Sequence, residues 1–279
     1  MKKIILIWIA FYCFPLVVFP QSLKKFKQRY KVTPGKTFRV KMNIDAGEIE
    51  ILKSPRPYEM RINASYRKDM YDFDVDFDED RSKIYIDLDR RKWLESSDED
   101  DSNLTIELPP EVALDFESRI KAGEIDMDFG GLTLQEIQTT TWAGEVKIDF
   151  SEPNVTEMDY LLINTKVGET TIKHLGNARF KEAEINGGIG ELKIDFSGDL
   201  LSRADVQVDL DIGETEILLP EDVAVKLRIS KFLFLSDVQI SGKLHKQGRY
   251  YRSENYESAS KKLYLKVRPG LGELSLSQE

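Results

Sequence analysis

The chain has 279 residues, of which 41% are hydrophobic and 10% aromatic, and this composition excludes a wholly disordered protein. Two histidines and one cysteine exclude a zinc site made of four cysteines, or of two cysteines and two histidines, and any disulfide within the chain. The formal charge of −9 has the wrong sign for nucleic-acid binding through phosphate neutralisation. The composition therefore predicts an acidic globular protein.

The N-terminus has the layout of a secretory signal peptide, which we predict over residues 1–21. Lys2 and Lys3 precede an apolar run over residues 4–19, and polar residues follow it. The run is short for a membrane span, which needs about 20 residues. Tyr12 stands where a lipoprotein signal requires a small residue, so lipid attachment at Cys13 is not expected. We expect an exported protein, periplasmic, secreted or on the cell surface, with an uncleaved N-terminal anchor as the alternative.

A glycine–glutamate step followed by alternating apolar residues recurs along the chain. Its copies begin at Gly47, Gly123, Gly144, Gly168, Gly190, Gly213 and Gly272. Between the second and sixth copies the spacings are 21, 24, 22 and 23 residues, and a nearly constant period in this range predicts a stacked repeat. Apolar residues at every second position indicate strands, and a rung of about 22 residues holds two short ones. A glycine between two such strands fits a tight corner.

The apolar side chains of successive rungs are predicted to stack into a shared core, because no rung can bury its apolar face alone. Ile125, Val146, Ile172 and Leu192 represent this column. Trp142 has the parity of the inward residues of its rung, so we expect it to pack in the core as well.

We expect a single elongated all-β domain over residues 22–279. Its N-terminal part, over 22–110, is less regular; the regular rungs cover 111–220; the C-terminal cap and final strands cover 221–279. The apolar cluster Phe232–Leu235 is predicted to cover the last full rung.

The glycine–glutamate rungs and the closing stretch resemble the toast-rack and adhesin-like families of bacterial envelope proteins, which look related to the C-terminal domain of LiaF-like cell-envelope stress proteins. The matching tail includes residues 223–227, 236–238, 248–256, 262–267 and 270–276. The resemblance covers Lys36 to the C-terminus. It implies a β-solenoid-like stack of short strands with capped ends, in an extracytoplasmic domain that generally lacks known catalysis. The absence of a preceding bundle of membrane helices, and of a lipobox, favours a free or loosely anchored protein.

The glutamates that follow the glycines are predicted to face outward in one row. The members of this carboxylate ladder are Glu124, Glu145, Glu169, Glu191 and Glu214. In register, neighbouring strands stand about 4.8 Å apart, so the ladder is either a binding site for divalent cations or a basic partner, or a set of solvated side chains and local caps. We favour the second interpretation, because the next outward column mixes acidic and basic residues.

Other polar groups give no recognisable catalytic or metal site. The aspartates at positions 72, 74, 76, 78 and 80 alternate with apolar residues, which predicts an exposed strand face, and their spacing fails the calcium-hand pattern. His174 is expected at the end of a rung and His245 in a turn, as surface or packing residues. We therefore predict no catalytic, cofactor-binding or metal-binding residue and no cofactor.

Exposed aromatic side chains are candidate partner contacts. They are Trp93, Tyr250, Tyr251 and Tyr256. The alternative interpretation, which we rate slightly higher, is that they cover the open ends of the β stack.

The sequence as a whole predicts an exported, non-enzymatic binding or scaffold module, adhesin-like, of the bacterial cell envelope. Its partner would be an envelope protein or polysaccharide, with no nucleic acid and no small-molecule cofactor, and its end strands could pair with another copy. The first alternative is a regulator or sensor of cell-envelope stress. The second is a carbohydrate-active enzyme on a β-helix, which would need a cleft with converging carboxylates.

Overall fold

The computed structural model describes residues 23–91, 102–231 and 235–278, and these residues form an all-β, β-solenoid-like stack. The predicted signal peptide over 1–21, Trp93, and positions 232–234 of the predicted cap lie outside the described residues. Within the described ranges there is no helical segment with the length and hydropathy of a membrane span.

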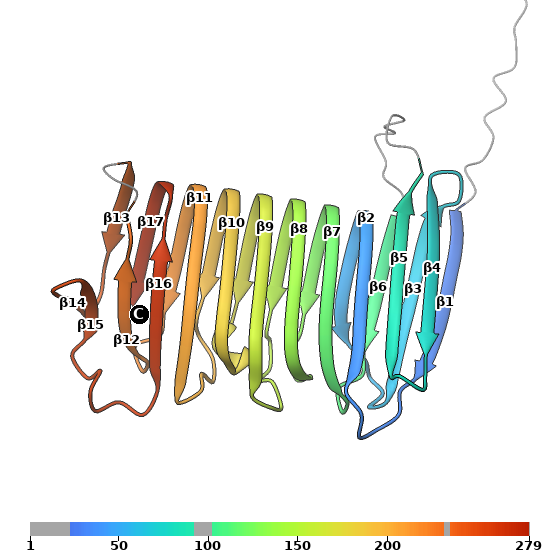
Figure 1. The fold of residues 1–279 in the computed structure, drawn as a ribbon, viewed down its shortest axis with the longest axis horizontal. Helices are drawn as coiled ribbons and strands as arrows, with labels where there is room; N and C mark the ends of the chain where they lie inside the picture. The colour runs from blue at the N-terminus through green and yellow to red at the C-terminus, as the bar shows by residue number, and fades with distance from the viewer. Residues whose placement is uncertain (1–22, 92–101, 232–234, 279) are drawn as a thin grey trace, which may run out of the picture.

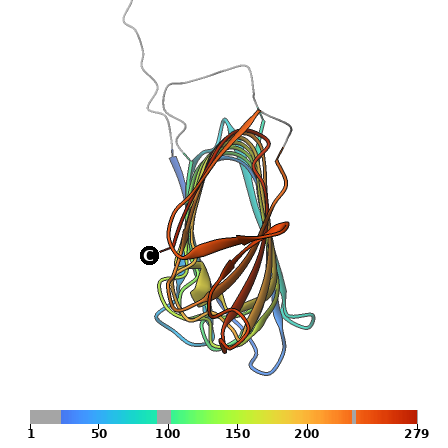
Figure 2. The same ribbon diagram turned by 90° about the vertical axis from the view of Figure 1, so that its left-hand side faces the viewer.

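Six long strands build the body of the stack. They are β2 (Phe38–Lys53), β7 (Ala113–Asp128), β8 (Thr133–Asp149), β9 (Met158–Lys173), β10 (Phe180–Asp195) and β11 (Arg203–Leu219). They pair in parallel in the order β2, β7, β8, β9, β10, β11. Hydrogen bonds join all the strands into one 17-stranded sheet, which folds over at the glycines into two facing layers. The sheet closes at one long edge, where the strands bend (Figure 2).

We name the layers by the halves of the bent strands. Layer A contains the segments before each glycine, and layer B contains the segments after it. Each rung is thus one continuous strand with a bend, where the sequence predicted two short strands. The short helical turn η1 (Leu175–Ala178) lies between β9 and β10, away from the glycine bend.

The glycines at the bend stack directly on one another, and no other residue fits there. Gly168 has φ +130°, and an added Cβ would overlap the backbone carbonyl oxygen of Gly144 in the rung below. The same overlap recurs from Gly123 to Gly272 along the stack. A side chain here would meet both an unfavourable backbone conformation and a steric clash, which explains why the glycine recurs.

The bend also reverses the alternation of inward and outward residues. In β9, the buried residues on either side of the bend are Thr165 and Thr170, five positions apart, so parity counted from one layer gives the wrong face in the other. The prediction that Trp142 packs in the core is wrong for this reason. Trp142 lies at the bend of β8 and is 58% exposed.

The ends of the stack are built from shorter strands. At the N-terminal end, layer A continues from β2 to β5 (Lys83–Arg90) and β4 (Tyr71–Asp78), and layer B continues to β6 (Ser102–Leu108), β3 (Glu59–Arg67) and β1 (Leu23–Lys31). At the C-terminal end, β16 (Lys262–Arg268) and β17 (Leu271–Gln278) pair with the two halves of β11.

Beyond these, β12 (Ala224–Ile229) extends layer A and β13 (Ser236–Ile240) extends layer B. The hairpin of β14 (Leu244–Gln247) and β15 (Tyr250–Ser253) then pairs with β12. The hairpin crosses the C-terminal end of the stack (Figure 2), so this end is partly covered.

One cluster of buried apolar side chains runs through the stack, from Tyr30 near one end to Leu276 near the other. Ile125, Val146 and Leu192 are buried in one column, as predicted. Ile172 is buried too, but it belongs to the neighbouring column, beside Ile148. The predicted stacking of apolar residues into a shared interior is therefore confirmed.

Buried asparagines hold the rungs together on the side opposite the glycine bend. Asn154 accepts a hydrogen bond from the backbone N–H of Leu134 at 2.8 Å and donates one to its carbonyl oxygen at 2.9 Å. Asn177 donates similarly to the carbonyl oxygen of Phe150 at 2.9 Å. These amides satisfy backbone groups that strand pairing leaves free at the loops.

Candidate binding surface

The predicted glutamates form a continuous row along the bend. Strand pairing places Glu124, Glu145, Glu169, Glu191 and Glu214 side by side on five successive strands. The structure extends this row with Glu48 at one end and with Glu273 and then Asp237 at the other. We call these eight residues the carboxylate row.

Lysines on the same strands neutralise only part of this charge. Lys147 Nζ lies 2.6 Å from the carboxylate of Glu145, and Lys193 Nζ lies 3.1 Å from that of Glu191. In both pairs the carboxylate raises the pKa of the lysine, chiefly through the hydrogen bond. The carboxylate row therefore keeps an excess of negative charge. Its two paired lysines lie on β8 and β10, two strands apart.

A row of exposed apolar side chains runs parallel to the carboxylate row, on the other side of the glycines. Its members are Val167 (49% exposed), Ile189 (52%), Ile212 (44%), Leu271 (36%) and Leu235 (48%). The first four stand in register on β9, β10, β11 and β17. Leu235 lies next to Leu271 in this row, because the carbonyl oxygen of Leu235 accepts a hydrogen bond from the backbone N–H of Gly272 at 3.3 Å. Four strand spacings give this apolar ridge a length of about 19 Å.

The carboxylate row and the apolar ridge together form one surface. Only the glycine separates a ridge residue from the carboxylate that follows it, as in Ile189, Gly190 and Glu191. Trp142 lies on the neighbouring rung, where Ala143 continues the ridge position. We call this combined surface, including Trp142, the corner surface. Exposed apolar side chains gathered in a line are uncommon on monomeric proteins and mark interaction sites.

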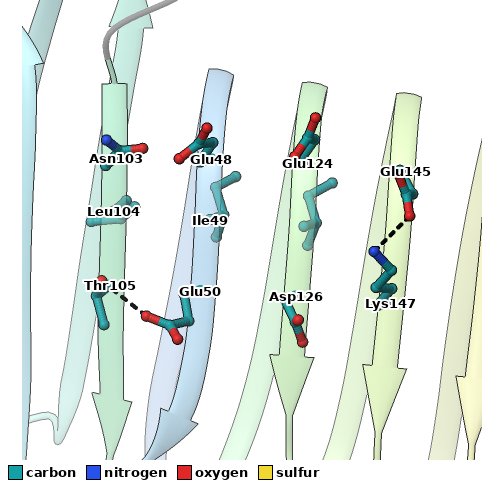
Figure 3. Close-up of a pocket in the computed structure, with 11 residues that line it drawn as sticks. Glu48, Ile49, Glu50, Asn103, Leu104, Thr105, Glu124, Asp126, Glu145 and Lys147 are labelled. Carbon is teal, nitrogen blue, oxygen red and sulfur yellow. Dashed lines mark hydrogen bonds and ion pairs between the residues drawn. The ribbon is translucent and has the colours of Figure 1, made fainter.

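The corner surface ends in an open acidic depression over β6, β2, β7 and β8 (Figure 3). Its lining includes the carboxylates of Glu48, Glu50, Glu124, Asp126 and Glu145, and Lys147 is the one lysine among them. Buried Ile49, Leu104 and Ile125 lie between the two lines of polar side chains. The carboxylates stand side by side on adjacent strands instead of facing one another across a cleft, so their arrangement suits a cationic group.

The remaining residues singled out in the sequence do not join this surface. The aspartates at 72, 74, 76 and 78 lie on the outward face of β4, as predicted, and Asp80 lies in the following turn. His174 is exposed before η1, with its Nδ1 2.8 Å from Asp149 Oδ1. His245 lies in β14, where a turn was expected, because the chain forms a hairpin there; its ring contacts Glu254 at 3.1 Å.

The tyrosines lie at the C-terminal end of the stack, far from the depression. Tyr250, Tyr251 and Tyr256 are each partly exposed, and Lys226 Nζ lies 4.5 Å from the ring centre of Tyr250. Tyr251 packs against the core. Burial is the main cause of the raised pKa of Tyr256. Their packing fits the role of covering the end, and contact with a partner stays a prediction.

Within the described residues, no three His, Cys, Asp or Glu side chains form a group that could hold a metal ion.

A family model described as the N-terminal domain of toast_rack matches residues 19–173, more than half of the chain. The chain belongs to the toast-rack family. A second model, described as the C-terminal part of the cell wall-active antibiotics response protein LiaF, matches residues 167–276. The second match contains the whole apolar ridge of this toast-rack protein, from Val167 to Leu271.

Solved structures give more distant likenesses. A proposed cell adhesion protein from Clostridium sporogenes is 15% identical, with 92% of this chain and 100% of that chain covered and a TM-score of 0.49. Proposed adhesins from Bacteroides fragilis (12%, 92% and 98% covered, TM-score 0.36) and Parabacteroides distasonis (9%, 92% and 97%, 0.39) follow. These values are too low to transfer a function. No curated protein matches the chain.

Sequence reasoning found the carboxylate row but missed the apolar ridge. The signal was present, because the residue before the glycine is Val167, Ile189, Ile212 or Leu271 in successive copies. Alternation counted back from Thr170 places Val167 outside, whereas alternation counted forward from Thr165 places it inside. The two counts disagree because the bend reverses the alternation.

Proposed function

We propose that this toast-rack protein is a non-enzymatic binding module of the cell envelope, and that its corner surface binds a cationic, amphipathic segment of a partner protein. The observation that carries the proposal is the in-register apolar ridge beside the carboxylate row. Apolar side chains of a partner would cover the ridge, and flanking lysines or arginines would meet the carboxylates. The acidic depression would take a further cationic group of the same partner.

The dimensions of the ridge favour a helical partner. A helix of about 13 residues spans 19 Å, and its apolar side chains recur at intervals of 5–6 Å, close to the rung spacing of about 4.8 Å. An anionic partner, such as a nucleic acid or an acidic polymer, would be repelled by the carboxylate row.

The test is a titration of the protein with a synthetic amphipathic helix that carries leucines on one face and lysines on its flanks. A scrambled peptide of the same composition is the control ligand. We expect the amphipathic peptide to bind more tightly, and the double variant Ile189→Ser/Ile212→Ser to weaken its binding at least about tenfold through lost apolar burial.

Val155→Ser is the matched control variant, because Val155 is 61% exposed but lies in the loop before β9. It should bind like the unmodified protein. Equal binding of both peptides, or equal binding by the double variant and the unmodified protein, would contradict the proposal.

A second candidate is regulation of the envelope stress response. It is supported by the match to the LiaF description over residues 167–276, which carry the ridge. Deletion of the gene should then change the expression of envelope-stress genes after antibiotic challenge, and the Ile189→Ser/Ile212→Ser variant should fail to restore it. Unchanged expression after deletion would contradict this role while leaving the binding proposal intact.

A further inference from the structure

The N-terminal end of the stack is stepped. Beyond β2, layer A has two strands, β5 and β4, and layer B has three, β6, β3 and β1. Layer B is therefore one strand longer, and β1 is the outermost strand (Figure 1). Among the described residues, no strand pairs with the outer edge of β1 or β4, so both edges offer free backbone N–H and C=O groups.

The two open edges carry opposite charges on their outward faces. The basic residues on the outward face of β1 are Lys25, Lys27, Arg29 and Lys31. The outward acidic residues of β4 are Asp72, Asp74, Asp76 and Asp78. In the part of the chain that the structure describes, Lys25, Lys27, Asp74 and Asp76 form no ion pair, so these charges are not satisfied within one copy.

The basic residues of β1 and the acidic residues of β4 lie at matching positions along the strand direction. The rings of Phe26 and Phe73 pack at 5.1 Å between centroids, and those of Tyr30 and Phe77 at 5.2 Å. Both contacts join residues 47 positions apart, so β1 and β4 run in the same direction. Each base of β1 therefore lies level with one aspartate of β4, from the pair 25 and 72 to the pair 31 and 78.

The aromatic side chains between the two edges are incompletely covered. Phe26, Phe73, Val75 and Phe77 pack against the core but are only partly buried. At this end the stacked interior thus continues up to the surface, where another apolar layer could extend it.

We propose that a second copy of the chain binds here head to head, related by a twofold axis parallel to the strands. The axis exchanges the two layers, so β1 of one copy pairs with β4 of the other and fills the place left by the step. The bases of each β1 then stand beside the aspartates of the other copy's β4 at the same heights, on both layers. The partly buried rings of the two copies cover one another.

The other head-to-head arrangement is excluded by charge and by shape. A twofold axis perpendicular to the layers would pair β1 with β1, base against base, and would leave a gap between the two β4 edges. Like charges on adjacent strands are destabilising. The charge pattern of the two edges therefore favours one of the two symmetric interfaces and disfavours the other. Specific interfaces commonly combine attraction in the correct arrangement with repulsion in the alternative one.

The test is sedimentation equilibrium of the full chain and of charge-reversal variants, with circular dichroism to verify folding. We expect a dimer that weakens with salt, because the contacts are ionic and near the surface. Lys27→Glu or Asp74→Lys should each weaken association at least about tenfold, since the twofold symmetry makes each substitution reverse a charge in two equivalent contacts. The combined variant Lys27→Glu/Asp74→Lys should restore association, because each contact is again a pair of opposite charges.

Lys173→Glu, an exposed reversal at the end of β9, is the control and should associate like the unmodified chain. A chain that is monomeric at all concentrations would overturn the proposal. So would association that ignores the single reversals, or a folded combined variant that stays monomeric. The result is independent of the corner surface, because it depends on different residues at the end of the stack.

Discussion

The regular stack and the N-terminal end use the same strands in opposite ways. In the stack from β7 to β11, every strand has neighbours on both sides, and equivalent residues stand beside one another. At the N-terminal end the layers differ in length, and the outermost strands β1 and β4 carry opposite charges. The comparison teaches that repetition creates long uniform surfaces along the stack, whereas two edges of opposite charge arise only at the end, where the repetition stops.

The largest expected effect is at the glycine bend of the stack. Gly168→Ala should lower the free energy of unfolding by about 4 kcal/mol, because the methyl group meets both the positive φ and the carbonyl oxygen of Gly144. Denaturant unfolding measures the change. Gly35→Ala is the matched control near the N-terminal end: its φ is +82°, but nothing lies within 4 Å of the added carbon, so about 1 kcal/mol is expected. Equal losses for both variants would contradict the stacking of the glycines.

Two isoleucines of β10 distinguish the core from the ridge. Ile194→Ala should cost about 3 kcal/mol, since Ile194 is 2% exposed, whereas Ile189→Ala should change stability by less than about 0.5 kcal/mol. Both substitutions remove the same atoms from the same strand, so thermal and denaturant unfolding compare them directly. A large loss for Ile189→Ala would mean that the ridge is part of the core.

The asparagine contacts opposite the bend should have an intermediate effect. Asn154→Ala leaves the backbone N–H of Leu134 and the carbonyl oxygen of Thr156 without their side-chain partner, and we expect a loss of about 2 kcal/mol. The carbonyl oxygen of Leu134 keeps the hydrogen bond from the Thr156 hydroxyl. Asn103→Ala, on the exposed face of β6, should be nearly neutral in the same unfolding assay. A neutral Asn154→Ala would show that water replaces the amide.

The smallest expected effect concerns the acidic face at the N-terminal end. Burial, together with the charges of Asp45 and Asp87, raises the pKa of Asp89. A carboxyl group whose pKa is raised by folding binds its proton more tightly in the native state, so its contribution to stability is present at low pH and lost as pH rises through the folded pKa. Asp89→Asn should therefore be more stable than the unmodified chain at pH 7, by about 0.3 kcal/mol after solvent screening.

The difference between the two chains should vanish at pH 3, where the carboxyl group is protonated in both states. Urea unfolding at the two pH values measures it. A variant that is less stable at pH 7 would show that the charge of Asp89 is compensated in the fold.

The repeat was predictable because one physical constraint acts on every rung. A glycine is required wherever the backbones of neighbouring rungs stack closely at the bend, so the positions of Gly123 to Gly213 reveal which residues align between rungs. Alternation after each glycine then places Ile125 and Val146 inside. The carboxylate row follows from the same register. These features depend on local sequence and on its repetition, which a single chain displays in full.

The remaining features depend on geometry that alternation does not encode. At the bend, consecutive inward positions lie five residues apart instead of two, so alternation counted from one layer gives the wrong face for Trp142 or for the apolar ridge. The N-terminal end places β2 beside β7, with β3 to β6 stacked outside them, and no periodic signal predicts this order. The opposite charges of β1 and β4 were visible in the sequence, but the sequence did not show that these strands form the two open edges at the same end of the stack.

The central claim is that successive rungs stack in register, because the corner surface exists only if they do. Electron spin resonance between pairs of labels tests it directly, in a chain with Cys13→Ser and labels introduced at Glu124→Cys together with Glu214→Cys or Glu273→Cys. These pairs are separated by four and five strands, so we predict distances of about 19 and 24 Å, one strand spacing apart. Distances that do not increase from the first pair to the second would contradict the account.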